Sequence, residues 1–165
     1  MSTADASRAA LRADGETILR KAIRAVLPDE AVRRALAGVQ FPGRVFLVAA
    51  GKAAWQMASV AHEALPALAG GVVVTKYGHA KGPIDGVACY EGAHPVPDEN
   101  GLRGTEAALA LTEGLRADDT VLFLLSGGGS ALFEKPLLPL AELQDVTNQL
   151  LAAGADIVEI NTIRK

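Results

Sequence analysis

Arg44-Val-Phe-Leu-Val-Ala-Ala50, followed by Gly51-Lys52-Ala53-Ala54, is the stretch of sequence that decides the fold. Between Pro42-Gly43 and Gly51 the run is almost continuously apolar, which is typical of a strand buried on both faces of a sheet. The residues that follow, 52–65, have a helical pattern. A buried strand followed directly by a helix predicts a parallel sheet with helices packed on it.

The same alternation continues along the rest of the chain. Strands are predicted over residues 71–76, 86–91 and 119–125, and helices over residues 4–27, 29–36, 100–115 and 140–152. The first helix carries an apolar stripe formed by Leu19, Ile23, Val26 and Leu27. Alternating strands and helices imply a mostly parallel sheet with helices on both faces. We therefore predict an α/β fold, a Rossmann-like three-layer domain that spans residues 1–165.

Composition narrows the class of protein. At 165 residues and 50% hydrophobic content, the chain is long enough for one domain with a buried core. The 16 basic and 19 acidic residues include no Lys/Arg cluster, so no nucleic-acid partner is expected. The single cysteine, Cys89, has no partner for a disulfide or a zinc site, so a cytoplasmic setting is expected. No stretch approaches the roughly 18 apolar residues of a membrane span, and no targeting segment is recognised.

Three polar segments follow predicted strands, and a parallel topology would bring them to one edge of the sheet, where such folds bind ligands. The first segment is Gly51-Lys52. A lysine in the first turn of a helix meets the positive end of the helix dipole, so an anionic ligand would compensate it, and a solvated lysine is the alternative. The segment is not a Walker P-loop, because Phe46 and Ala53 stand where that motif needs glycine and Ser or Thr.

The second segment is Ser126-Gly127-Gly128-Gly129-Ser130, directly after the strand that ends at Leu125. Three consecutive glycines expose backbone N–H groups that can cradle a phosphate or a carboxylate, and a flexible turn is the alternative. Leu132 stands at the third glycine position of a dinucleotide fingerprint, so a nicotinamide cofactor is poorly supported. Leu132 also replaces the last glycine of the hydrolase nucleophile elbow, so a serine nucleophile is not indicated.

The third segment contains His94 and Asp98, with Pro95 and Pro97 making the backbone rigid around them. His94 either donates to an anion or bonds a neighbouring carbonyl. Asp98 either binds a ligand or caps the helix that follows. The other histidines and two lysines are expected to be surface or packing residues: His62, His79, Lys76 and Lys81.

The last motif is Glu159-Ile-Asn161-Thr-Ile-Arg164-Lys165. Its two isoleucines are expected to be buried. Arg164 and Lys165 are expected to add positive charge to the same site, and Asn161 to add a polar contact. A natural domain seldom ends on such residues, so we expect the chain to be cut short.

Together these motifs resemble the bacterial glycerate 2-kinases, which combine a DUF4147 amino-terminal domain with a MOFRL carboxy-terminal domain. The resemblance runs from about residue 10 to the last residue. It is carried by four ordered motifs: Gly51-Lys52-Ala53-Ala54 with Met57-Ala58, Gly92-Ala-His94-Pro95-Val-Pro97-Asp98, Leu125-Ser126-Gly127-Gly128-Gly129-Ser130-Ala131-Leu132, and Glu159-Ile-Asn161-Thr-Ile-Arg164-Lys165.

The resemblance implies ATP-dependent phosphorylation of D-glycerate to 2-phosphoglycerate, with a divalent metal such as Mg²⁺ and a site between two domains. Lys52 matches the signature lysine of the family and is implied to supply positive charge to the phosphoryl group or to the glycerate carboxylate. The remaining candidate residues would bind substrate or phosphate: Ser126, Gly127, Gly128, Gly129, Ser130, His94, Asp98, Asn161, Arg164 and Lys165. Two alternatives stay open, a hydroxypyruvate reductase that uses a nicotinamide cofactor and a non-catalytic fragment that binds anions.

The resemblance also implies a truncated chain. Family members continue past the Asn-Thr-Ile-Arg-Lys motif, complete the first domain and add the MOFRL domain, which is absent here. The chain is therefore expected to cover less than half of a usual member and to be inactive alone. A sheet edge left unpaired by truncation would favour a homodimer.

Overall fold

The centre of the protein is a sheet of four parallel strands in the order β3-β2-β1-β4. The structure is a computed structural model that describes residues 3–65 and 67–164. The strands are β1 (Val45–Ala50), β2 (Gly70–Lys76), β3 (Val87–Gly92) and β4 (Thr120–Leu125). The predicted α/β fold with a parallel sheet is confirmed.

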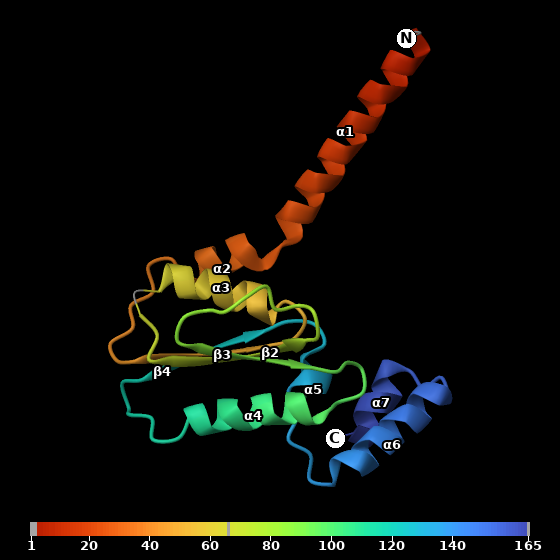
Figure 1. Cartoon of the computed structure of the whole chain (residues 1–165). Helices are drawn as coiled ribbons and strands as arrows, with labels where there is room; N and C mark the ends of the chain where they lie inside the picture. Colours follow the sequence, from red (N-terminus) through yellow and green to blue (C-terminus); the bar gives the residue numbers. More distant parts are fainter. Residues whose placement is uncertain (1–2, 66, 165) are drawn as a thin grey trace.

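Helices cover both faces of the sheet (Figure 1). The helices α2 (Pro28–Leu36) and α3 (Ala54–Ala64) lie on one face, and α4 (Glu99–Leu111) lies on the other. Along β1 the side chains alternate: Leu47 packs in the core on the α3 side, whereas Val48 packs in the core that contains Ala108 of α4. Because both faces are covered, all six residues of β1 are buried, as its apolar run predicted.

The first helix, α1 (Thr3–Val26), extends away from the sheet (Figure 1). The helix itself was predicted, but its apolar stripe lies in solvent: Leu19, Ile23 and Val26 are 64%, 59% and 81% exposed. The helical periodicity of apolar residues therefore predicted the element and not its packing. No helix in the described part of the chain is long and apolar enough to cross a membrane.

Three helices follow β4. The helix α5 (Gly129–Leu132) is a single turn behind the triple-glycine loop, and α6 (Leu140–Ala152) and α7 (Ile157–Arg164) lie together beyond it (Figure 1). The α6 helix was predicted with the same bounds, whereas α7 was not predicted. The expectation that its isoleucines are buried is wrong, because α7 has no buried residue among those described, and Ile163 is 61% exposed.

Two helix boundaries also differ from the prediction. The helix α3 begins at Ala54 and not at Lys52. The backbone amides of Lys52 and Ala53 donate instead to the loop after β4, to the Gly127 carbonyl and the Ser126 hydroxyl. Lys52 therefore precedes the helix and does not lie in its first turn. The helix α4 ends at Leu111 and not at residue 115, since the chain turns at Thr112, whose hydroxyl donates to the carbonyl of Leu109 at 2.7 Å.

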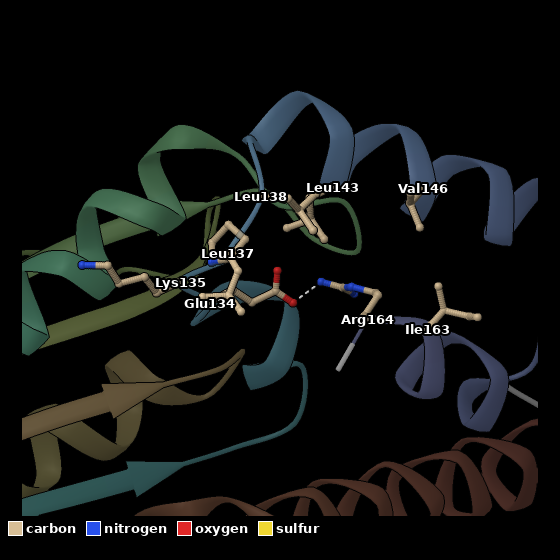
Figure 2. A pocket seen from close by; sticks show the side chains of 9 residues that line it. Glu134, Lys135, Leu137, Leu138, Leu143, Val146, Ile163 and Arg164 are labelled. Carbon is tan, nitrogen blue, oxygen red and sulfur yellow. Dashed lines mark hydrogen bonds and ion pairs between the residues drawn. The ribbon is translucent and has the colours of Figure 1, made fainter.

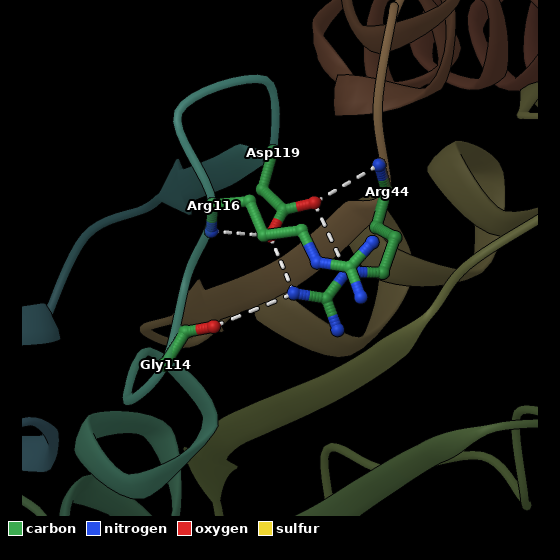
Figure 3. A network of polar contacts seen from close by, with 4 residues as sticks. All are labelled: Arg44, Gly114, Arg116 and Asp119. Atoms are coloured by element: carbon green, nitrogen blue, oxygen red, sulfur yellow. Dashed lines mark hydrogen bonds and ion pairs between the residues drawn. The ribbon is translucent and has the colours of Figure 1, made fainter.

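A charged pair joins the starts of β1 and β4 at the amino edge of the sheet (Figure 3). Arg44 Nε and Nη2 donate to the two carboxylate oxygens of Asp119 at 3.0 and 2.5 Å, and the amide of Arg116 donates to Asp119 at 2.7 Å. The Asp119 side chain is only 1% exposed. The hydrogen bonds from Arg44 hold the pKa of this carboxyl well below its ordinary value, so the pair is ionised and links the two strands.

Candidate functional site

The carboxyl ends of the strands bring the predicted polar segments to one edge of the sheet. Ala50, the last residue of β1, lies in register with Val74 of β2 and with Leu125 of β4. Lys76 of β2 lies in register with Gly92 of β3. The loops that begin at residues 51, 77, 93 and 126 therefore share this edge, as the parallel topology predicted.

The backbone of Lys52 is held from two sides. Its amide donates to the carbonyl of Gly127 at 2.9 Å, and the next amide donates to the Ser126 hydroxyl at 3.0 Å. Its carbonyl accepts from Nδ1 of His79 at 2.8 Å. Gly51 makes this turn possible with a φ of 112°, and a Cβ there would lie 2.4 Å from the carbonyl oxygen of Ser126. Lys52 thus has a fixed backbone and an exposed side chain.

Gly128 is the point at which the predicted motifs meet. It has a φ of 83°, and a Cβ added to it would lie 3.0 Å from Nε2 of His94 and 3.1 Å from Cε of Lys52. Three segments far apart in the sequence thus contribute groups to one small region. A glycine is required here by its backbone conformation and by the approach of these two side chains.

His94 lies half-buried in the loop after β3, before a cis peptide bond to Pro95. Burial lowers the pKa of its imidazole, and the positive charges of Lys52, Lys76 and Arg164 lower it further, although a hydrogen bond to its own backbone opposes them. His94 is therefore neutral at pH 7. The three cations around it come from the ends of β1 and β2 and from α7.

The other members of the glycine loop have different surroundings. Gly127 is exposed, and an added Cβ would meet no atom within 4 Å, whereas Gly129 is buried against Leu125 at the start of α5. The Ser126 hydroxyl is engaged within the fold, because it accepts from the amide of Ala53 and donates to the carbonyl of Ala50 at 3.3 Å. Its hydroxyl therefore supports the turn at Lys52.

Asp98 caps helix α4. One carboxylate oxygen accepts from the amide of Gly101 at 3.0 Å, and the other accepts from the hydroxyl of Tyr77 at 2.6 Å. Partial burial raises the pKa of this carboxyl, but the hydrogen bonds from Tyr77 and from backbone amides outweigh it, so the pKa lies below its ordinary value. Of the two roles that the sequence left open, the structure places Asp98 in the capping role.

The last motif lies beside the glycine loop. Asn161 and Arg164 of α7 line a cavity of about 260 Å³ together with Ser130 and Glu134. Arg164 forms an ion pair with Glu134 next to an apolar groove between the chain after α5 and the helices α6 and α7 (Figure 2). Desolvation raises the pKa of Glu134 against the opposing effect of Arg164. Nε of Arg164 and the second carboxylate oxygen of Glu134 are buried without a partner, and Lys165 lies outside the described residues.

Three residues that shape this site were not predicted from the sequence: Thr75, Glu91 and His79. Thr75 is fully buried and donates to the carbonyl of Gly51 at 2.9 Å. Glu91 accepts from the amides of His79 and Ala80 at 3.0 and 2.9 Å, which fixes the turn that carries the His79 ring. A threonine at the end of a buried apolar strand was a signal for Thr75. His79, expected to be a surface or packing residue, supports the fold by bonding the carbonyl of Lys52, a contact that has no local signal in the sequence.

The charges at this edge suit an anion. Within residues 3–65 and 67–164, neither Lys52 nor Lys76 forms a salt bridge. No group of three or more His, Cys, Asp and Glu side chains that could hold a metal occurs in the same residues. The geometry can therefore bind a negatively charged group and neutralise it, with Lys52 and the backbone at Gly128 nearest to it.

Fold and site together define the class of protein: a Rossmann-like α/β domain with a cluster of cations at the carboxyl edge of its parallel sheet. The sequence profile of the DUF4147 family, described as a domain of unknown function, matches residues 14–165. The chain belongs to this family, as its motifs predicted.

Relatives extend this assignment. A protein of Thermotoga maritima named D-glycerate 2-kinase is 55% identical over 151 residues, which cover 90% of this chain and 36% of that protein. A protein of Agrobacterium vitis that carries the name of a hydroxypyruvate reductase is 44% identical over 126 residues, covering 74% of this chain and 28% of that protein. The crystal structure of a glycerate kinase from Thermotoga maritima superposes with a TM-score of 0.82 at 52% identity, covering 94% of this chain and 38% of that chain. The chain thus spans about a third of the length of the curated relatives it matches.

Proposed function

We propose that this chain contributes to the active site of a glycerate kinase, which transfers a phosphoryl group from ATP to the 2-hydroxyl of D-glycerate and yields 2-phosphoglycerate. One observation carries the proposal: Cε of Lys52 and Nε2 of His94 lie about 3 Å from the same point above Gly128. The kinase names of close relatives support the choice of substrate.

Lys52 supplies the main positive charge in this proposal. Its backbone is fixed by bonds to Gly127 and His79, and Cε of its side chain lies 3.1 Å from the point where a Cβ on Gly128 would be. Phosphoryl transfer needs mostly positioning and neutralisation of developing charge. Lys52, with the backbone of the glycine loop, meets that need for the transferred group or for the glycerate carboxylate.

The proposed reaction also needs a nucleotide and a divalent metal. A triphosphate fits the charge of the region, because Lys52, Lys76 and Arg164 all act on His94. Mg²⁺ finds no cluster of three or more carboxylate, histidine or cysteine ligands among the described residues. We propose ATP with Mg²⁺ as the substrate form, with no metal ligand assigned to the described residues.

The test is a chimera that joins residues 1–165 to the segment that follows the matched region in the Thermotoga maritima relative. We expect the chimera to phosphorylate D-glycerate with ATP, and ³¹P NMR of the product identifies the isomer. The matched control is the 165-residue chain alone, which should bind D-glycerate or inorganic phosphate without turnover. A folded chimera that forms no phosphoglycerate would contradict the proposal.

The reductase named among the relatives is the second candidate. It predicts that hydroxypyruvate and NADH or NADPH are consumed by the same chimera without ATP. Leu132 at the third glycine position of the dinucleotide fingerprint disfavours this activity. Following NADH absorbance with and without ATP separates the two enzymes. A chimera that binds anions and turns over neither substrate would instead support a non-catalytic module.

A further inference from the structure

Transfer of a phosphoryl group to an alcohol requires a group that takes the proton of the hydroxyl. Such a base must reach the hydroxyl and must be unprotonated at the working pH. The carboxyl edge of the sheet carries few groups that qualify. Lys52, Lys76 and Arg164 are cations, so the candidates are the carboxylates and histidines of the neighbouring loops.

Most of these candidates are already engaged. Both oxygens of Asp98 accept hydrogen bonds, from Gly101 and Tyr77. Glu91 binds two backbone amides, and Glu134 is paired with Arg164. His79 uses Nδ1 to donate to the carbonyl of Lys52, and its ring is not among the atoms nearest to Gly128. Each of these groups holds part of the fold in place.

His94 differs from all of them. Its Nε2 faces Gly128 beside Lys52, 3.0 Å from the point where a Cβ on Gly128 would lie. A neutral imidazole carries its lone pair on one ring nitrogen, and in the tautomer with the N–H at Nδ1 that nitrogen is Nε2. In this tautomer the lone pair lies where the proposed anionic substrate is neutralised.

We propose that Nε2 of His94 is the general base that accepts the proton of the substrate hydroxyl. This inference rests on the proposed kinase function. The hydroxyl oxygen forms a bond to the γ-phosphorus of ATP, the bond from that phosphorus to the β,γ-bridging oxygen breaks, and ADP leaves with that electron pair. The hydroxyl proton moves to Nε2, and the imidazolium later releases it to water.

The surrounding charges suit this role. Lys52 and Lys76 act on His94 from the ends of β1 and β2, and Arg164 acts from α7. On its own loop, the carboxylate of Asp98 is engaged by the hydroxyl of Tyr77 and the amide of Gly101. Because burial and the neighbouring cations lower the pKa of His94 from its ordinary value, the neutral imidazole predominates at pH 7. The rate should fall only as the pH drops through this lowered pKa.

The first experiment uses the chimera with His94→Gln, and His62→Gln on α3 as the matched control. General-base catalysis is worth about 10² to 10⁴ in rate, so we expect kcat to fall by at least about 10² while KM for D-glycerate changes by less than about threefold. The acidic limb of the kcat–pH profile should disappear in His94→Gln and remain in His62→Gln. A kcat within about threefold of the parent, with an unchanged profile, overturns the proposal.

The second experiment needs neither activity nor a variant. ¹⁵N NMR of the histidine rings in the 165-residue chain should show Nε2 of His94 unprotonated at pH 7, a pKa below 6.5, and a shift on addition of D-glycerate. Protonation at Nε2 in the neutral ring would overturn the base assignment. An unmodified chimera without kinase activity would contradict the proposed function, and the ring protonation would still decide whether His94 presents a free Nε2.

Discussion

The two ends of the sheet carry opposite arrangements of charge. At the amino edge Arg44 and Asp119 neutralise each other, and the Asp119 side chain is buried among donors (Figure 3). At the carboxyl edge Lys52, Lys76 and Arg164 act on His94, and no salt bridge to Lys52 or Lys76 exists in the described residues. The charges at the amino edge pair with each other, whereas the carboxyl edge keeps two lysines that form no salt bridge within the described residues and that an anionic ligand would pair.

This difference separates stability from function. Gathering like charges disfavours the folded state, so removing Lys52 or Lys76 should leave the free energy of unfolding unchanged or raise it slightly. Breaking the Arg44–Asp119 pair should lower stability with little direct effect on ligand binding. Variants at one edge, measured for both stability and ligand binding, therefore separate the two properties.

Replacing Lys52 with Ala should have the largest effect on activity. Loss of one charge-stabilising group from such a site lowers the rate by about 10² to 10³. We expect kcat/KM of the chimera for D-glycerate to fall by that factor, while Tm stays the same or rises. Lys21→Ala on the exposed helix α1 is the matched control. Near-normal turnover in Lys52→Ala would remove Lys52 from the site.

Replacing Gly128 with Ala should have the next largest effect. Its φ of 83° disfavours any side chain by about 1–2 kcal/mol, and the added Cβ would displace His94 or Lys52. We expect about tenfold weaker binding of D-glycerate by calorimetry and a lower Tm. Gly127→Ala is a close control, because its Cβ would enter open space with no positive φ. Equal behaviour of the two variants would show that Gly128 has no special role.

Much of the fold could be predicted because its signals are local. The buried run of β1 and the apolar spacing of α6 lie in continuous sequence, and the parallel topology then brought Lys52 and the glycine loop to one edge. The start of α3 could not be predicted in this way. It depends on a hydroxyl, Ser126, that lies 73 residues later in the chain than the amide it binds.

The remaining misses have the same cause. The His79 ring bonds the carbonyl of Lys52 from a turn that Glu91 of β3 holds through the amides of His79 and Ala80. The exposed stripe of α1 and the 62% exposed Leu125 on the edge strand β4 have no covering segment in the described chain. Association of a second copy with that edge stays a prediction, which light scattering over a range of concentrations can test.

Replacing Asp119 with Asn tests the opposite edge. The pKa of Asp119 is lowered in the folded chain, so its carboxylate stabilises the fold above its ordinary pKa, near 4, and loses this effect as the pH falls. We expect Asp119→Asn to lower Tm at pH 7 by several degrees, with a smaller loss at acidic pH. Binding of D-glycerate should change little. Asp118→Asn, one residue earlier and without the hydrogen bonds from Arg44 that Asp119 accepts, should leave Tm close to the parent value.

Replacing Thr75 with Val tests how a buried core residue supports the turn at the carboxyl edge, and it should have the smallest effect. Valine keeps the shape of the side chain but removes the hydroxyl that donates to the carbonyl of Gly51 at 2.9 Å, so a buried carbonyl loses a donor. The amide of Ala54 still donates to this carbonyl at 3.1 Å, so losing the hydroxyl costs about 0.5–1.5 kcal/mol, the net value of one hydrogen bond. Because Gly51 sets the turn that directs Lys52, we expect a fall of a few fold in kcat/KM beside the lower Tm. Thr75→Ser keeps the donor and should recover kcat/KM, although the lost methyl group still lowers Tm. If Thr75→Ser and Thr75→Val lose the same activity, packing and not the hydrogen bond holds Lys52 in place.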